Sequence, residues 1–222
     1  MGARVLCLCF FFAGAMPAQG PGAGGIGNLH RPTFTSFDAP GAASGDGQGT
    51  EPASVNAEGT IAGFYDDANN VLHSFVRAID GTIATFDAPD AGTSSGQGTN
   101  ACCINGAGIV AGSYVDASGI NHGFVRAADG TITTFDAPGA AGTFAFSIDK
   151  KGAITGVYVD ANGLDHGFIR DPSGLAITSF EAPGAGSASG QGSTGYSIDN
   201  LGAIAGYYYD ASNVVHGFLL TP

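Results

Sequence analysis

The sequence predicts an all-β protein, a four-repeat β-propeller built of four-stranded antiparallel blades. Three observations predict this fold. A strand-rich segment recurs four times, Gly, Asp and Asn turn signals separate short runs of β-branched and aromatic residues, and outside the N-terminus no stretch shows the apolar periodicity of a helix. A β-solenoid or an open repeat stack is the alternative, because repeats of this length also build stacked arrays.

The N-terminal residues differ in composition from all that follows. Arg4 precedes an apolar run at 5–15, and small residues continue to Ala18. A basic start, an apolar core and a small-residue site predict a signal peptide over residues 1–18. The run is shorter than the ~20 residues that span a bilayer, so we expect a secreted protein, extracellular or periplasmic, with no membrane span after cleavage. Residues 19–32 are predicted to be a Gly-rich linker.

Residues 33–222 are predicted to form the β domain. Its four repeats cover 33–81, 82–130, 131–174 and 175–222. Two positions mark them, an aromatic residue early in each repeat and a histidine late in each repeat. These residues are Phe37, Phe86, Phe135 and Phe180, and His73, His122, His166 and His216.

The third repeat shows the four predicted strands in order. They cover 131–137, 143–149, 153–160 and 164–170, and turn residues separate them. A Gly- and Ser-rich link after the first strand is the longest connection in the repeats, so we expect it to cross between blades. Residues 33–38 would then complete a sheet with the last three strands and close the ring.

The hairpin after Tyr158 has a predicted register. Residues 160–163 have Asp first and Gly last, which is typical of a type I turn leading into a bulge. This turn places Tyr158 opposite His166 and Gly156 opposite Phe168, so that the Phe168 ring covers the glycine. Apolar residues then lie on both faces of the hairpin, which indicates that each sheet is packed between neighbours.

This recurring pattern resembles a known family of repeats. In residues 149–168 an Asp is followed by Gly152, by Gly156 and Tyr158, and then by an Asp and a His-Gly-Phe tripeptide. The pattern is similar to the HAF repeats of bacterial extracellular proteins, with Gly or Ser in place of the Ala of the name. The resemblance covers nearly all of the β domain and implies an exported repeat protein with a propeller-like fold. It implies no catalytic residues.

The charge balance excludes some classes of partner. The formal net charge is −12, and charged residues make up 12% of the chain. An acidic surface repels nucleic-acid phosphates and anionic lipid, so we expect no nucleic-acid partner and no docking on such membranes.

Metal and ligand candidates come from the repeated turns and histidines. The turn carboxylates belong to Asp67, Asp116, Asp160 and Asp210. Calcium takes six or more oxygen ligands and each turn offers about one carboxylate, so we expect no cofactor, with calcium as the alternative. The candidate ligand-binding residues are His73, His122, His166 and His216. Packing is the other interpretation of these histidines, because duplication also copies structural residues.

Two adjacent cysteines remain after the predicted cleavage. Neighbouring residues such as Cys102 and Cys103 do not form an ordinary disulfide without strain. The other repeats have serine at the position of Cys103, so we interpret the pair as small strand residues.

The sequence predicts an exported, non-catalytic repeat protein that acts as a monomeric binding or scaffold module at or outside the cell surface. Its expected partner is an extracellular glycan or protein. One alternative is a propeller enzyme that acts on extracellular carbohydrate with repeat-borne Asp and His residues as acid and base. Near-equal repeats provide no distinctive pair of carboxylates, which favours a non-enzyme. A calcium-stabilised surface module is the other alternative.

Overall fold

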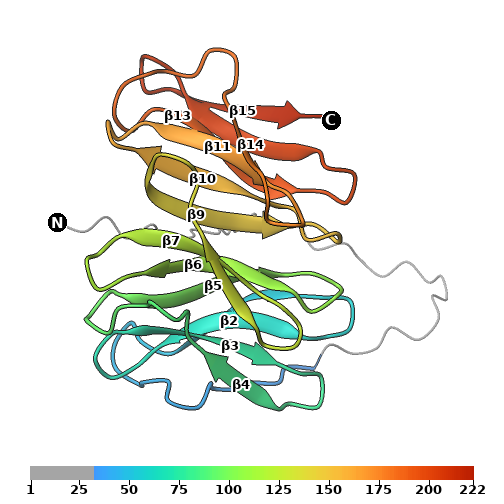
Figure 1. The fold of residues 1–222 in the computed structure, drawn as a ribbon. Coiled ribbons are helices and arrows are strands. Elements are labelled where there is room, and N and C mark those ends of the chain that lie inside the picture. The colour runs from blue at the N-terminus through green and yellow to red at the C-terminus, as the bar shows by residue number, and fades with distance from the viewer. Residues whose placement is uncertain (1–32) are drawn as a thin grey trace, which may run out of the picture. The chain divides into compact units, whose positions relative to one another are not determined.

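Short strands and tight turns make up the described chain, residues 33–222, in this computed structural model (Figure 1). The chain is all-β and has no helix within that range. The predicted signal peptide, 1–18, and linker, 19–32, lie outside the described residues.

Each of the first three layers contains the last three strands of one predicted repeat and the short first strand of the next, and the fourth layer contains three strands. We count each layer as one repeat. The strands of the first two repeats are β1 (Thr50–Val55), β2 (Ile61–Asp66), β3 (Leu72–Arg77), β4 (Ile83–Phe86), β5 (Gly98–Ile104), β6 (Val110–Val115), β7 (Asn121–Arg126) and β8 (Ile132–Phe135). Those of the last two are β9 (Ala140–Ile148), β10 (Ile154–Asp160), β11 (Asp165–Arg170), β12 (Ile177–Phe180), β13 (Gly192–Ile198), β14 (Ile204–Tyr209) and β15 (Val215–Leu220).

The strands form two mixed sheets. One has eight strands, in the order β1-β2-β3-β5-β6-β7-β8 with β4 beside β3; the other has seven, in the order β15-β14-β13-β11-β10-β9 with β12 beside β11. Pairing within each repeat is antiparallel. A single parallel pair joins neighbouring repeats within each sheet, Leu72 with Gly98 and Asp165 with Gly192.

The short strands β4, β8 and β12 confirm where the long links cross. Each pairs with the strand before it, β3, β7 and β11, so the Gly-rich link that follows leads to the next layer. Figure 1 shows these layers following one another from blue to red. Within the described range, β15 pairs with β14 alone and residues 33–38 form no strand. Closure of a four-blade ring therefore stays a prediction.

The predicted hairpin register is confirmed. Tyr158 lies opposite His166 and Gly156 opposite Phe168. A Cβ atom on Gly156 would lie 2.9 Å from the Phe168 ring, so the aromatic side chain covers the glycine. In the corresponding turns of the first and last repeats, the residues at the position of Gly163 are Asn70 and Asn213, with positive φ values of 58° and 61°. Asparagine tolerates this left-handed conformation better than most residues.

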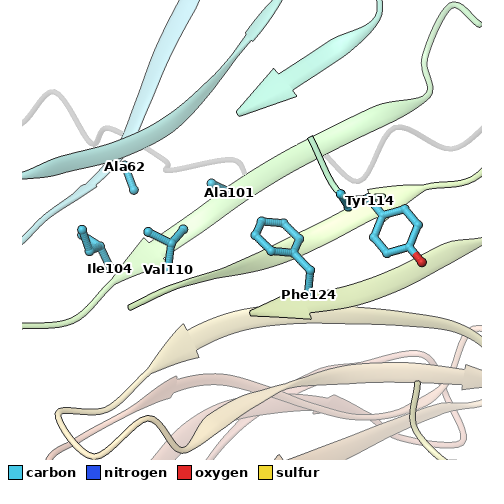
Figure 2. Close-up of a cluster of buried hydrophobic side chains, with 7 residues drawn as sticks. Ala62, Ala101, Ile104, Val110, Tyr114 and Phe124 are labelled. Carbon is cyan, nitrogen blue, oxygen red and sulfur yellow. The ribbon is translucent and has the colours of Figure 1, made fainter. Parts of the chain in front are cut away.

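Apolar side chains pack on both faces of the inner layers, as predicted. One cluster joins the first two repeats and contains Ala62, Ala101, Ile104, Val110, Tyr114 and Phe124, which Figure 2 shows. Phe124 is fully buried, and the ring of Phe86 meets it edge-on with ring centroids 5.9 Å apart. The strand before each long link therefore packs against the next repeat as well as pairing with its own.

A β-bulge recurs in the first full strand of every repeat. The extra residue is Ala53, Cys102, Phe146 or Tyr196. A bulge bends its strand and increases the local twist. Both described cysteines are free thiols, and Cys103 packs against Ala111 and Ala145, which fits their interpretation as small strand residues.

Arginine side chains at the ends of β3, β7 and β11 lie over aromatic rings. The guanidinium of Arg77 lies 4.7 Å from the centre of the Phe37 ring, and Arg126 and Arg170 lie 5.0 and 4.9 Å from Phe86 and Phe135. Such cation–π contacts stabilise by about 0.5–2 kcal/mol each.

No helix of residues 33–222 has the length and apolar character needed to cross a membrane.

Candidate functional site

The four predicted histidines lie at one end of their hairpins. They are next to the turns that join β2 to β3, β6 to β7, β10 to β11 and β14 to β15. Each histidine ring stacks on the tyrosine directly opposite, with centroids 4.7–5.2 Å apart. We call this set the histidine rim, and it consists of His73, His122, His166 and His216.

A carboxylate holds Nδ1 of the first three rim histidines. Nδ1 of His73 lies 2.9 Å from Asp87, and Nδ1 of His122 lies 2.9 Å from Asp136. His166 makes the same contact with Glu181. These acids follow the aromatic residue that ends β4, β8 or β12, and the pairing of those strands brings them to the histidines.

A second carboxylate, from the turn, faces Nε2 of each rim histidine. Its oxygen lies 3.8 Å from Nε2 in His73, 3.5 Å in His122 and 3.7 Å in His166, beyond good hydrogen-bond distance. His216 differs from the others: its Nε2 lies 3.3 Å from Asp210, and no carboxylate of the described residues meets its Nδ1.

The four turn aspartates proposed as calcium ligands are used by their own turns. In Asp116, Oδ1 accepts hydrogen bonds from the backbone N–H groups of Ser118 and Ile120. Asp67, Asp160 and Asp210 make the equivalent pair of bonds. Within residues 33–222 no group of three or more His, Cys, Asp or Glu side chains is arranged to hold a metal ion.

The two neighbouring carboxylates favour protonation of His122. In His122, burial by itself lowers the pKa, but the hydrogen bond and charge of Asp136, followed by the nearby Asp116 carboxylate, outweigh it and leave the pKa raised. The pKa of Asp116 is lowered, first by the backbone hydrogen bond from Ile120 and also by His122. The pair therefore favours an imidazolium next to an ionised carboxylate.

All the basic residues of the described chain lie at the other end of the repeats. Arg77 and Arg126 pair with the first residues of β2 and β6, far along the hairpins from the rim turns. Arg170 pairs with Ile154 at the start of β10, directly after the turn that carries Lys150 and Lys151. The histidine rim therefore has carboxylates and no Lys or Arg among residues 33–222.

The candidates from the sequence thus meet in pairs and not as one site. Each rim histidine joins the turn aspartate of its own repeat, and the four clusters follow one another from repeat to repeat. Sequence reasoning missed the Nδ1 carboxylates of Asp87, Asp136 and Glu181. The signal was present, because an acidic residue follows each recurring phenylalanine.

Comparisons with known proteins give a distant likeness. No family model and no curated protein matches the chain, so the resemblance to HAF repeats stays a prediction. One similar solved structure, titled as a streptogramin B lyase, is 15% identical over 77% of this chain and 54% of that chain, with a TM-score of 0.45. Another, a virginiamycin B lyase from Staphylococcus aureus, is 15% identical over 75% of this chain and 69% of that chain, with a TM-score of 0.34.

These comparisons correct one expectation. We expected a non-catalytic protein from the sequence. That prediction was wrong when set against these comparisons, because both solved structures carry the name of an enzyme. The chain spans about half the length of the first of them. Likeness at this level concerns the fold, and it brings neither the lyase reaction nor its substrate to this chain.

Proposed function

We propose that the chain is an exported enzyme that transfers protons at its histidine rim and acts on a neutral or cationic extracellular carbohydrate. The observation that carries the proposal is the geometry of the first three clusters. A carboxylate lies 2.9 Å from Nδ1 of His73 and of His122, and Nε2 has no close hydrogen bond. A carboxylate on Nδ1 fixes the tautomer and leaves the Nε2 lone pair available as a general base.

The turn carboxylate supplies the other half of the proposed chemistry. When Nε2 takes a proton, the ring becomes a cation with a carboxylate on each side, such as Asp136 and Asp116 around His122. Both charges stabilise this imidazolium, which lowers the barrier to proton abstraction. One imidazole between two carboxylates moves one proton, so the reaction class is general-base catalysis rather than hydrolysis by two separated carboxyl groups.

Charge supports the choice of substrate class. The rim combines turn and partner carboxylates with no Lys or Arg of residues 33–222, so it repels uronates and other polyanions. Neutral and cationic polysaccharides meet no such barrier. Export, supported by the basic and apolar residues at 4–15, would expose the rim to carbohydrates outside the cell.

The finer fold assignment belongs to the same proposal. Each repeat is one blade, so the chain supplies four blades of a propeller, with the rim clusters on successive blades. Support comes from the antiparallel four-stranded repeats and from their face-to-face packing. The proposed chemistry uses side chains of the chain alone and needs no calcium.

The test compares two triple variants that remove equal charge. The first changes the Nδ1 carboxylates, with Asp87→Asn, Asp136→Asn and Glu181→Gln; the control changes turn carboxylates at the other end of the repeats, with Asp80→Asn, Asp129→Asn and Asp171→Asn. Product formation is measured on soluble xylan, chitosan and polygalacturonate. We expect turnover of a neutral or cationic polymer, about 10²–10⁴-fold lower kcat in the rim variant, and unchanged kcat in the control.

The dependence on pH gives a second readout. A general base works when deprotonated, so the part of kcat/KM that depends on His122 should rise as the pH increases through the raised pKa of that imidazole. The proposal fails if no polymer of the panel is converted. It also fails if the rim variant, folded by circular dichroism, keeps the wild-type kcat.

A further inference from the structure

The outer edge of β15 has no neighbouring strand in the described chain. In the first three repeats the corresponding edge is covered by a four-residue strand, β4 on β3, β8 on β7 and β12 on β11. β15 pairs with β14 alone, and Val215 and Leu219 are 53% and 68% exposed. An uncovered edge offers backbone N–H and C=O groups to another strand.

Two residues on β15 lack the side-chain contacts that their counterparts in earlier repeats make with the short fourth strand and the acid that follows it. Gly123 and Gly167 lie directly under the rings of Phe135 and Phe180, whereas a Cβ atom on Gly217 would meet nothing nearer than a backbone oxygen at 3.9 Å. The neighbouring His216 has no carboxylate at Nδ1 among the described residues. β15 thus lacks both an aromatic ring and an acid.

One segment of the chain has the sequence that these positions require. β4, β8 and β12 read apolar-x-Thr/Ser-Phe and are followed by an acid, and residues 34–38 read Phe-Thr-Ser-Phe-Asp. The corresponding first residues, Ile83, Ile132 and Ile177, are partly buried, but Phe34 is fully exposed. Phe37 already packs edge-on against Phe75, as Phe86 does against Phe124.

We propose that residues 34–37 of one chain add as the missing fourth strand to β15 of a second copy, so that chains associate head to tail. The register follows from β11 and β12, where Gly167 lies opposite Phe180 and Arg170 opposite Ile177. In that register Phe37 covers Gly217 of the second copy, and Phe34 lies opposite Leu220 of the second copy. The proposal does not depend on the proposed catalysis.

The residue at the end of β15 fits this partner. The first three repeats have arginine opposite the isoleucine that begins the short strand, as in Arg77 opposite Ile83. The last repeat has Leu220 there, which faces the aromatic Phe34 in the proposed register. The exposed Phe34 and the partly buried Leu220 would bury more of each other's apolar surface in this contact.

The stacked faces also match. Between neighbouring repeats a serine hydroxyl accepts a hydrogen bond from a buried strand residue, Ser54 from Ile104 and Ser147 from Ile198. Ser197, the corresponding serine of the last repeat, is exposed. The residue that would donate to it, Val55 of a second copy, is 64% exposed, whereas Ile104 and Ile198 are each 7% exposed.

Docking would also complete the fourth rim cluster. Asp38 is exposed and follows Phe37 as Asp87 follows Phe86. It therefore reaches Nδ1 of His216 in the second copy, as Asp87 reaches Nδ1 of His73. Head-to-tail contacts of this kind close into a ring or continue as a row. This assembly replaces the monomer expected from the sequence.

The first test is sedimentation velocity of the full chain across a range of concentration. We expect the wild type to form dimers and larger species as concentration rises. Gly217→Val has room in the single chain but meets the docked Phe37 ring, so we expect it to stay monomeric. Gly217→Ser is the matched control, because Ser74 already lies opposite Phe86 in the first repeat, and we expect it to associate like the wild type.

A mixing experiment tests the head-to-tail geometry. Phe34→Asp prevents residues 34–37 from docking and leaves β15 able to accept a strand. Gly217→Val blocks β15 and leaves residues 34–37 able to dock. We expect each variant to be monomeric alone and the mixture to form a dimer that grows no further, because the remaining two ends are both disabled.

Several results would overturn the proposal. A wild type that is monomeric at every concentration would do so, and so would Gly217→Val associating like the wild type or an equimolar mixture that stays monomeric. If the wild type is monomeric and Phe34→Asp lowers its Tm, the strand pairs within its own chain and the second copy is not its partner.

Discussion

Each complete rim cluster places a histidine between two carboxylates while a tyrosine covers one face of its ring. Around His122 these groups are Asp136, Asp116 and Tyr114. Ring stacking limits rotation of the imidazole, and the carboxylate on Nδ1 fixes which nitrogen carries the proton. The cluster thus combines a defined ring orientation with partial access to solvent, because the His122 side chain is 21% exposed.

The raised pKa of His122 predicts how its contribution to stability depends on pH. Its folded-state pKa lies above the usual 6.5, so its stabilising contribution is fully present below about pH 6.5 and is lost as the pH rises through the folded value. We expect the difference in unfolding free energy between wild type and His122→Gln to decrease over that range. Urea denaturation at a series of pH values measures it.

The turn carboxylates should show the opposite dependence of stability on pH in the same experiment. The pKa of Asp116 is lowered, mainly by the backbone hydrogen bond from Ile120, so its contribution is present above pH 3.8 and is lost as the pH falls through the folded value. A His122→Gln difference that stays constant from pH 5 to pH 9 would contradict the assignment of the raised pKa to this ring.

The sequence predicted half of each cluster. The recurring His122 and Asp116 were identified because they lie six residues apart within one hairpin, where a turn of known type determines their proximity. Asp136 was not identified, because its approach to His122 depends on how β8 pairs with β7. Recurrence shows that a residue is retained in each copy, but strand register decides which side chains meet.

At the scale of elements, side chains in the β1–β2 turn and its counterparts connect successive layers. Asn105 is 5% exposed, and its Oδ1 accepts hydrogen bonds from Ala107 and Ile109 within its own turn. Its Nδ2 donates to the carbonyl of Asp149 in the next repeat, at 3.1 Å. One side chain therefore stabilises a turn and an interface between repeats.

Two substitutions separate these contributions. Asn105→Ala removes all three hydrogen bonds, so we expect a loss of about 3 kcal/mol in unfolding free energy. Asn105→Asp keeps the acceptor oxygen, as Asp149 does in the third repeat, and loses the donated bond, so we expect about half that loss. Chemical denaturation measures both losses. No loss in Asn105→Asp would show that the contact between repeats contributes nothing, and equal losses in the two variants would show that the bonds within the turn contribute nothing.

Sequence reasoning performed well where elements are local. The hairpin of β10 and β11 was predicted to the residue because turn chemistry and the Gly156–Phe168 pair both determine its register. The segment at 33–38 was predicted to be a strand, yet it forms none. A strand needs a partner edge for its backbone groups, and the sequence does not reveal whether that edge is supplied.

At the scale of the whole molecule, stability comes from contacts between successive repeats. Extensive contacts between strands of different repeats join repeats that follow one another, as in β2 with β5, β6 with β9 and β10 with β13. In such an array the free energy is close to a sum of repeat and neighbour terms. A terminal repeat has one neighbour in the single chain and an inner repeat has two.

Hydrogen exchange should therefore vary along the array. We expect amides of β6 and β10, which lie inside their sheets, to exchange most slowly, and those of β15 and β1 to exchange fastest in the single chain. Exchange followed by NMR or mass spectrometry on Gly217→Val, at a concentration where it is monomeric, measures the order. Uniform protection of all fifteen strands would indicate one cooperative unit instead.

The separation of charge between the two ends of the repeats has a consequence for how the protein meets surfaces. With a net charge of −12 and every described Lys and Arg at the end opposite the rim, the molecule has an electric dipole along its strands. Near an anionic surface the net charge repels the molecule, but within the ~8 Å over which charges act at physiological salt the dipole turns the Arg and Lys end toward that surface. The rim would then face the medium, so the charge pattern orients a molecule that approaches such a surface without holding it there.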